Sequence, residues 1–405
     1  MKVLLGAFWL LLAILSLASS SAAALTPPLP LQGRFGCIDA AGGYVVPPIY
    51  SHIDSCGGSV IAVYRNGFGG FLDSQGKEIL PTKFKLQGQT SLPAFQYGWE
   101  PAGELGHVGY IDKQGAFRIP PQFMAAYRFG PSGYAMVFVR DDHDPNWKRV
   151  WIDRAGNFVI QPRSDWIGYL SSNDRGIISE NGLNNFGYID HTGTIRIPEQ
   201  FEKAEPFAAN GLAAVEIAGR WGFIDAAGKF VVPARYKQAS NFGTSGAPPN
   251  LARVILGSRE LYIDRFGRTK IALPPGAFTW EGFSGGLAAA SRVQDHQWGY
   301  INKSGRWVIE AHFQSARAFA ANGLAEVMAD GKWGYINRAG KLVISPQFEN
   351  AMSFASNGLA PVLVGRKWAY INSKGDLAIQ PQYDSAWAHE DNGLALVEAG
   401  RPRLP

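Results

Sequence analysis

One short phrase recurs along this chain, and a recurring phrase constrains a fold more tightly than composition does. It reads Trp-Gly-Tyr-Ile-Asn-x-x-Gly at residues 298–305 and 333–340, and it returns at 368–375 with Ala in place of the first Gly. Weaker copies lie upstream. The repeat-defining residues that we expect to be structural are Trp221, Gly222, Trp298, Gly299, Trp333, Gly334 and Trp368.

Every copy ends in the same turn signal, an Asp or Asn with Gly three residues later. The Asp or Asn stands at residues 39, 73, 112, 153, 190, 225, 264, 302, 337 and 372. The glycines are Gly42, Gly76, Gly115, Gly156, Gly193, Gly228, Gly267, Gly305, Gly340 and Gly375. Successive turns are 34 to 41 residues apart, so repeats fill almost the whole chain after its first residues.

The residue types within one repeat predict short β-strands joined by tight turns. Asp or Asn suits the first position of a type I turn, and Gly takes the left-handed conformation that closes a hairpin. Before the turn, Trp and Tyr fall on one face of a strand and Gly and Ile on the other. After it come an apolar pair, a Pro that we expect to end the strand, and an aromatic residue. An Asn-Gly-Leu-Ala phrase such as residues 322–325 then begins the next strand, which makes about three strands per repeat.

The phrase Lys-Trp-Gly-Tyr-Ile-Asn at residues 332–337, with its Pro-x-Phe and Asn-Gly-Leu-Ala companions, resembles the bacterial WG-repeat proteins, also called KWG-repeat proteins. The resemblance covers roughly residues 31 to 400. Four repeats depart from it, because Gly69, Val108, Arg149 and Glu260 stand where Trp is expected. The resemblance implies a repeat architecture and export, and it brings no catalytic residues to carry over.

We therefore expect an all-β fold, a tandem array of about ten three-stranded hairpin repeats. Each repeat is too small to bury its own apolar face, so neighbours must stack. We favour an open, curved or superhelical stack. The alternative is a β-propeller-like closed ring or rings, because the chain begins in phase with the hairpin and ends with the strand that normally precedes it.

The first residues are typical of a secretory signal peptide. Lys2 precedes an apolar stretch and small residues that end at Ala24, and the stretch is too short to span a bilayer. We expect residues 1–24 to be removed, 25–400 to form the repeat domain and 401–405 to be a tail. Removing Lys2 lowers the net charge from +5 to +4, a small excess that is scattered and does not favour nucleic-acid binding. We expect no membrane span in the mature chain, and a periplasmic or secreted location.

The two cysteines, Cys37 and Cys56, remain in the mature chain. Disulfides persist in exported proteins, and an even number favours a bridge. Two buried free thiols are the alternative, and the sequence leaves both open.

Candidate ligand-binding residues are sparse, and we expect no cofactor and no metal. The repeat tryptophans and tyrosines are expected to be buried structure. Trp99, Trp147, Trp151, Trp166 and Trp280 stand outside the repeat phase. The irregular span 98–182 is where we expect a ligand surface, with the candidates Trp99, Trp147, Trp151, Trp166, Asp142 and His143.

The function that we expect is an exported, non-catalytic interaction protein that binds a protein or cell-envelope partner through its repeat surface. One alternative is a module that binds cell-wall glycans. The other is a hydrolase that uses the irregular repeats at 98–182. No nucleophile elbow, phosphate-binding loop or Cys-His context supports an enzyme.

Overall fold

Each turn signal forms the tight reversal that its residues predict. In the ninth repeat, β30 (Leu324–Ala329), β31 (Lys332–Asn337) and β32 (Leu342–Phe348) are antiparallel neighbours. Between β31 and β32, the side-chain Oδ1 of Asn337 accepts hydrogen bonds from the backbone N–H groups of Ala339 and Lys341. Gly340 has a φ of 80°, which only glycine adopts without strain. All ten turn glycines have positive φ, so this part of the prediction is confirmed.

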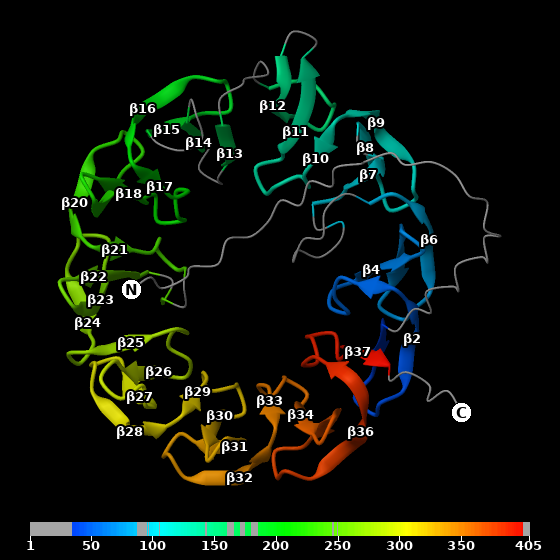
Figure 1. Cartoon of the computed structure of the whole chain (residues 1–405). Helices are drawn as coiled ribbons and strands as arrows, with labels where there is room; N and C mark the ends of the chain where they lie inside the picture. The colour runs from blue at the N-terminus through cyan, green and yellow to red at the C-terminus, as the bar shows by residue number, and fades with distance from the viewer. Residues whose placement is uncertain are drawn as a thin grey trace, which may run out of the picture. The chain divides into compact units, whose positions relative to one another are not determined.

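The computed structural model describes residues 35–86, 95, 97–104, 106–141, 144–159, 166–170, 175–179, 185–244, 247–248 and 250–399. These residues form nine antiparallel β-sheets, and none of them is helical. The predicted signal peptide and the tail 401–405 lie outside the described residues. Figure 1 shows the succession of small sheets.

Six of the sheets have four strands in chain order. Their strands are β3 (His52–Ile53), β4 (Val60–Arg65), β5 (Phe68–Asp73) and β6 (Glu78–Phe84); β13 (Trp166–Leu170), β14 (Gly176–Ser179), β15 (Phe186–Ile189) and β16 (Ile195–Phe201); β17 (Lys203–Ala204), β18 (Ala213–Ile217), β19 (Arg220–Ile224) and β20 (Phe230–Tyr236); β21 (Gln238–Ala239), β22 (Ala252–Leu256), β23 (Arg259–Ile263) and β24 (Thr269–Ala272); β25 (Ala277–Thr279), β26 (Leu287–Arg292), β27 (Trp298–Asn302) and β28 (Trp307–Phe313); and β29 (Ser315–Ala316) with β30, β31 and β32.

Two sheets have three strands and one has seven. The three-stranded sheets are β7 (Glu100–Glu104), β8 (His107–Ile111) and β9 (Phe117–Phe123), and β10 (Ala125–Ala126), β11 (Ala135–Asp141) and β12 (Asp144–Ile152). The seven-stranded sheet contains, in spatial order, β2 (Tyr44–Tyr50), β1 (Phe35–Ile38), β37 (Ala395–Ala399), β36 (Leu377–Ala386), β35 (Lys367–Ile371), β34 (Ala360–Val364) and β33 (Asn350–Ala351).

The repeat has four strands in most sheets, where we expected three. The additional strand is short: β29 has two residues and pairs with β30 through Ser315 and Ala316. Pro346 also does not end its strand, because β32 continues through it to Phe348. β32 lies at the edge of its sheet and contains a β-bulge. Tyr335 pairs with Ile344 and Trp333 with Phe348, so a step of two residues on β31 corresponds to a step of four on β32. Proline is tolerated at such edges and bulges, where its missing N–H breaks no ladder.

The bulge explains the Gly of the Trp-Gly pair. A Cβ on Gly334 would lie 2.5 Å from the carbonyl oxygen of Ile344, which is backbone and cannot turn aside. In the tenth repeat Ala369 occupies this place and is fully buried, so the bulged strand can adjust to one methyl group.

The hydrophobic core lies between consecutive sheets. Tyr335 packs in a cluster with Ala351 and Val362 of the next sheet. Its neighbour Ile336 packs in another cluster with Tyr300 and Ile309 of the preceding sheet. Because the strand buries both of its faces, the repeat reads as apolar at nearly every position. The prediction of an all-β array of stacked repeats is confirmed.

The first and last strands pair with each other, which corrects our preference for an open stack. β1 runs antiparallel to β37, with Cys37 opposite Leu396. Figure 1 shows the red β37 beside the blue first strands. The closed alternative therefore describes the chain better, because closure pairs two edges that an open stack would leave exposed.

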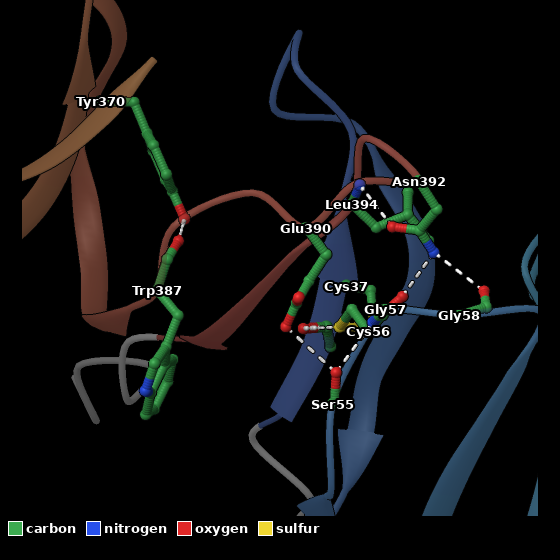
Figure 2. Close-up of a disulfide and its surroundings, with 11 residues drawn as sticks. Cys37, Ser55, Cys56, Gly57, Gly58, Tyr370, Trp387, Glu390, Asn392 and Leu394 are labelled. Atoms are coloured by element: carbon green, nitrogen blue, oxygen red, sulfur yellow. Dashed lines mark hydrogen bonds between the residues drawn. A yellow bond between two sulfur atoms is a disulfide. The ribbon is translucent and has the colours of Figure 1, made fainter. Parts of the chain in front are cut away.

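Side chains from both ends of the chain reinforce this closure (Figure 2). Cys37 on β1 and Cys56, just after β3, form a disulfide bond. Ser55 donates a hydrogen bond of 3.1 Å to Glu390, and the side-chain amide of Asn392 donates one of 2.7 Å to the carbonyl of Cys56. The disulfide thus ties the closing strand β1 to the segment that β37 and its preceding loop also contact.

Candidate functional site

The candidate residues from the irregular span that the structure describes lie in different environments. Trp151 is 1% exposed and donates its indole N–H to the carbonyl of Gly168, so it belongs to the core. It pairs with Met136 just as Tyr335 pairs with Glu326, and it therefore occupies the Tyr position of the repeat. Its place two residues before Asp153 is the sequence signal that reveals this. Expecting a ligand contact there was wrong.

The other candidates are divided between core, surface and undescribed residues. Trp99 is half-buried against Phe129, with their ring centroids 5.6 Å apart. Trp147 is 43% exposed and contacts Phe138 edge-on. Trp166 lies in β13, where its side chain is not described, and Asp142 and His143 lie outside the described residues.

The repeat tryptophans are largely buried, as the sequence predicts, and yet two of them border grooves. Trp221 and Trp333 are 8% and 7% exposed, and Trp298 and Trp368 are half-buried. Trp221 and Trp298 each form part of a groove between their own sheet and the next one.

The larger groove has a volume of about 510 Å³ and lies between the sheets β17–β20 and β21–β24. Its lining is mostly polar: Lys203, Glu205, Trp221, Gln238, Ala239, Ser240, Asn241, Thr244, Arg253 and Ile255.

Most charged groups of the larger groove are held by neighbours. Lys203 forms an ion pair of 2.8 Å with Glu216. Arg253 donates to the carbonyl of Thr279 at 2.7 Å. The carboxylate of Glu205 has no hydrogen bond or ion pair within the described part of the chain, and burial raises its pKa. Glu205 is therefore the charged group in this groove most available to a ligand.

The smaller groove, of about 260 Å³, lies between the sheets β25–β28 and β29–β32. It is lined by Trp280, Glu281, Ala289, Trp298, Ser315, Ala316 and Arg317.

Strand register shows that the two grooves occupy the same place in the repeat. Lys203 on β17 pairs with Glu216 on β18, which in turn pairs with Trp221 on β19. In the same way, Phe278 on β25 pairs with Ser291 on β26, which pairs with Trp298 on β27. Two residues further along, Glu205 in one groove therefore corresponds to Trp280 in the other. The repeat builds one groove twice and lines it differently.

Sequence reasoning missed most of these residues. Trp280 was visible because it stands outside the repeat phase. Nothing in the sequence marked Glu205, Glu281 or Arg317, because a groove between sheets is lined by neighbouring repeats together.

The described residues contain no group of three or more His, Cys, Asp or Glu side chains placed to hold a metal ion. A polar cluster near the N-terminus joins His52 and Tyr64 to Asp54, each at 3.2 Å. No hydroxyl or thiol nucleophile hydrogen-bonds to His52 in the described structure, which a nucleophilic site would require. Among the residues with described positions, no helix is long and apolar enough to cross a membrane.

The model of the WG-containing repeat family matches residues 109–141, 151–183, 186–221, 221–258, 298–333, 333–368 and 368–400, which together exceed half of the chain. No curated protein matches the sequence.

Three solved structures show distant likeness. A eukaryotic initiation factor has 11% identity and a TM-score of 0.44, over 85% of this chain and 99% of that one. A catalytically inactive virginiamycin B lyase from Staphylococcus aureus has 11% identity and a TM-score of 0.26, over 67% and 94%. The extracellular domain of a putative one component system from B. thetaiotaomicron has 12% identity and a TM-score of 0.26, over 88% and 66%.

Proposed function

The chain belongs to the family of WG-containing repeat proteins, and we propose that it is an exported, non-catalytic protein that binds a protein or cell-envelope partner in the grooves between its sheets. The observation that carries the proposal is the recurrence of one groove at equivalent positions, beside Trp221 and Trp298. A groove that recurs with the repeat but changes its lining is what a binding surface built from repeats provides.

Two observations support export. Residues 1–24 have the order of charge, apolar stretch and small residues that is typical of a signal peptide. Cys37 and Cys56 are joined in a disulfide, which persists in the periplasm or outside the cell and is rare in the cytosol.

A capture experiment with a matched pair of variants tests the binding proposal. The mature chain, residues 25–405, is immobilised and exposed to an envelope extract. Glu205→Gln removes the unpaired charge of the larger groove, and Glu310→Gln makes the same change on the exposed edge strand β28. We expect a partner that is retained by the wild type and by Glu310→Gln, and lost or weakened about tenfold with Glu205→Gln. A partner retained equally by all three proteins would contradict binding in this groove.

A glycan is the second candidate partner, and one observation favours it: the smaller groove presents a strongly exposed tryptophan, Trp280. The hydrolase alternative depends on Asp142 and His143, which lie outside the described residues, and no described residue supports it.

A further inference from the structure

Trp280 is the most exposed of the large apolar side chains that the structure describes, at 72%. The corresponding positions of other repeats hold polar residues in some cases, such as Glu205, Ser240 and Arg317, and aromatic or apolar residues in three more, Tyr127, Met352 and Trp387. An exposed indole costs free energy in water, and Trp280 is far more exposed than Tyr127 at 39% or Trp387 at 41%, so its exposure needs a reason.

The indole belongs to a row of three aromatic rings. Phe278 on β25 contacts Trp280 edge-on, with centroids 6.4 Å apart, and contacts Trp298 at 6.1 Å. Trp298 borders the same groove. The row holds Trp280 at one wall of the groove and presents an apolar surface to whatever enters.

Polar groups line the rest of the groove: Glu281 follows Trp280 directly in the chain, whereas Ser315 and Arg317 come from the side of the next sheet. Glu281 accepts a hydrogen bond of 2.7 Å from the backbone N–H of Ala318 through Oε2, which fixes the carboxylate and leaves Oε1 available. The guanidinium of Arg317 is about half exposed, and the hydroxyl of Ser315 makes no hydrogen bond within the described chain. Carboxylate, guanidinium and hydroxyl together can accept from and donate to neighbouring hydroxyl groups.

The charge and the volume of the groove limit the kinds of ligand that can bind in it. One carboxylate and one guanidinium balance each other, so a cationic ligand would meet Arg317 and an anionic one Glu281. The volume of 260 Å³ falls just below the roughly 300–1,000 Å³ of pockets for drug-sized molecules. The groove therefore fits one ring with an apolar face and polar edges, while the rest of the ligand stays outside.

A pyranose ring has this character, because its axial C–H groups form an apolar face and its hydroxyl groups form a polar rim. We propose that the groove beside Trp280 binds one hexopyranose ring of a neutral oligosaccharide, packed on the indole and hydrogen-bonded to Glu281, Arg317 and Ser315. This inference rests on the proposed function, since it names the ligand of one of the two grooves.

The experiment is a titration of the mature chain with cellotetraose, maltotetraose, mannotetraose and tetra-N-acetylchitotetraose, followed by tryptophan fluorescence and calorimetry. Trp280→Ala removes the apolar wall, and Glu281→Gln keeps the acceptor but removes the charge. Phe266→Ala is the control, because it removes an exposed aromatic ring from a turn of another sheet, outside both grooves. We expect at least one sugar to bind, with affinity at least tenfold lower in Trp280→Ala, several-fold lower in Glu281→Gln and unchanged within twofold in Phe266→Ala.

Three results would overturn the inference: no sugar binds, a sugar binds Trp280→Ala as tightly as the wild type, or a tetralysine peptide binds the groove in preference to every sugar. Each is distinct from a failure of the proposed function. If a captured partner depends on Glu205 but no sugar binds, the proposed function stands and only the sugar inference fails. If a sugar binds and depends on Trp280, the inference for the smaller groove stands even when Glu205→Gln has no effect on capture.

Discussion

The hydroxyl of Tyr335 donates a hydrogen bond of 2.8 Å to the backbone carbonyl of Met352, which lies 17 residues later in the next sheet. The same bond, over the same separation of 17, joins four further pairs: Tyr110 to Tyr127, Tyr188 to Glu205, Tyr300 to Arg317 and Tyr370 to Trp387. The Tyr of the repeat phrase therefore links each such repeat to the one that follows by a directional contact, in addition to apolar packing.

Replacing Tyr335 with Phe should lower the free energy of unfolding by about 1 kcal/mol, because the partly buried carbonyl of Met352 loses its donor while the ring packing remains. Urea unfolding measures the change. Tyr44→Phe is the control, since that hydroxyl is exposed and makes no hydrogen bond in the described structure. Phe223 occupies the Tyr position of the sixth repeat, so the fold itself tolerates Phe. Equal effects of the two variants would refute the linking role.

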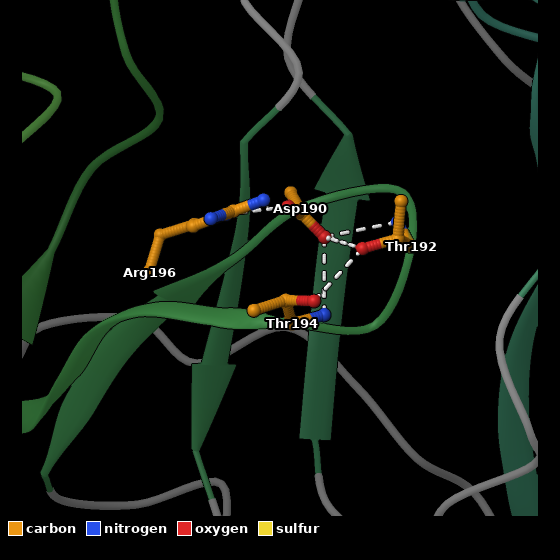
Figure 3. A network of polar contacts seen from close by, with 4 residues as sticks. All are labelled: Asp190, Thr192, Thr194 and Arg196. Carbon is orange, nitrogen blue, oxygen red and sulfur yellow. Dashed lines mark hydrogen bonds and ion pairs between the residues drawn. The ribbon is translucent and has the colours of Figure 1, made fainter.

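The turn at Asp190 should make stability depend on pH in the acid range (Figure 3). Desolvation would raise the pKa of this carboxyl, but hydrogen bonds from Thr192, Arg196 and the amide of Thr194 outweigh it and lower the pKa to about 2. Because the pKa of Asp190 is lower in the folded state, its ionised carboxylate stabilises the fold fully above about pH 4, the ordinary pKa range of Asp. This stabilisation is lost as the pH falls toward 2.

Asp190→Asn should reduce this acid sensitivity while preserving the turn, because Asn337 makes the same backbone contacts in the ninth repeat. The measurement is the thermal midpoint at pH 2.5 and at pH 7. Asp391→Asn, at an exposed carboxyl without a described contact, is the control and should leave the difference between the two midpoints unchanged. A wild-type difference that persists in Asp190→Asn would show that the acid sensitivity arises elsewhere.

The disulfide should contribute about 3 kcal/mol, since it closes a loop with a sequence separation of 19 and so restricts the unfolded chain. We expect the double variant Cys37→Ala, Cys56→Ala to unfold at a lower denaturant concentration than the oxidised wild type. A reductant should bring the wild type down to the level of the variant and leave the variant unchanged. Stability that does not respond to the reductant would contradict this contribution.

The sequence predicted what is decided within a few residues and missed what depends on distant ones. The reversal at Asn337 and Gly340 follows from the chemistry of a single turn, and the same chemistry recurs in every copy. The two-residue strand β33 is too short to show an alternating pattern. The closing pair Cys37 and Leu396 joins the two ends of the chain, and the phase of the repeat indicated this pairing only as an alternative to an open stack.

The grooves were beyond sequence reasoning for a related reason. Trp280 was noticeable by its phase, but its polar counterpart Arg317 comes from the next repeat and reads as an ordinary surface residue. The irregular span 98–182 drew attention to Trp151 because its repeat is degenerate, and at Trp151 the degeneracy changed a buried side chain. A residue that stands outside the repeat phase marks its repeat as different from the others. Its position in the sequence does not tell whether its side chain is buried or exposed.

Glu326 should destabilise the protein as the pH rises. It is 1% exposed, its Oε2 has no hydrogen-bond partner, and Arg317 is 3.9 Å from Oε1. Burial raises its pKa to about 7, against the smaller opposing effect of Arg317. The folded state therefore holds this proton more tightly than the unfolded chain, and stability falls between about pH 4.5 and 7.

Glu326→Ala should remove that fall, which amounts to up to about 3 kcal/mol for a shift of this size. Ala is native to the position, because Ala214 and Ala289 stand there in the sixth and eighth repeats. Urea unfolding at pH 5 and pH 8 measures the change, and Glu310→Ala on the exposed edge strand is the control. A variant that keeps the wild-type loss between these pH values would rule out Glu326 as its source.

His389 should weaken the closure of the chain on mild acidification. It replaces the Phe that other repeats place against the motif Tyr, and its ring lies 5.0 Å from that of Tyr370, as Phe354 lies 4.8 Å from Tyr335. Its Nε2 donates to the carbonyl of Asp39 at 3.3 Å, and its buried Nδ1 has no partner. Burial lowers its pKa, with the contact to Asp39 opposing.

Because the pKa of His389 is lower in the folded state, the unfolded chain binds a proton more readily as the pH falls through about 6.5, and stability is lost in that range. His389→Phe should leave stability at pH 7.5 equal or higher and remove the loss between pH 7 and 5, measured by thermal midpoints. His107→Phe, at an exposed histidine on β8, should keep the wild-type slope. The ring of His389 contacts Asp39, which lies at the opposite end of the chain. We therefore expect the wild type to lose amide-exchange protection in β1 and β37 at pH 5, and His389→Phe to retain it. That result would place the effect at the pairing of the first and last strands. Loss of protection spread evenly over all sheets would contradict it.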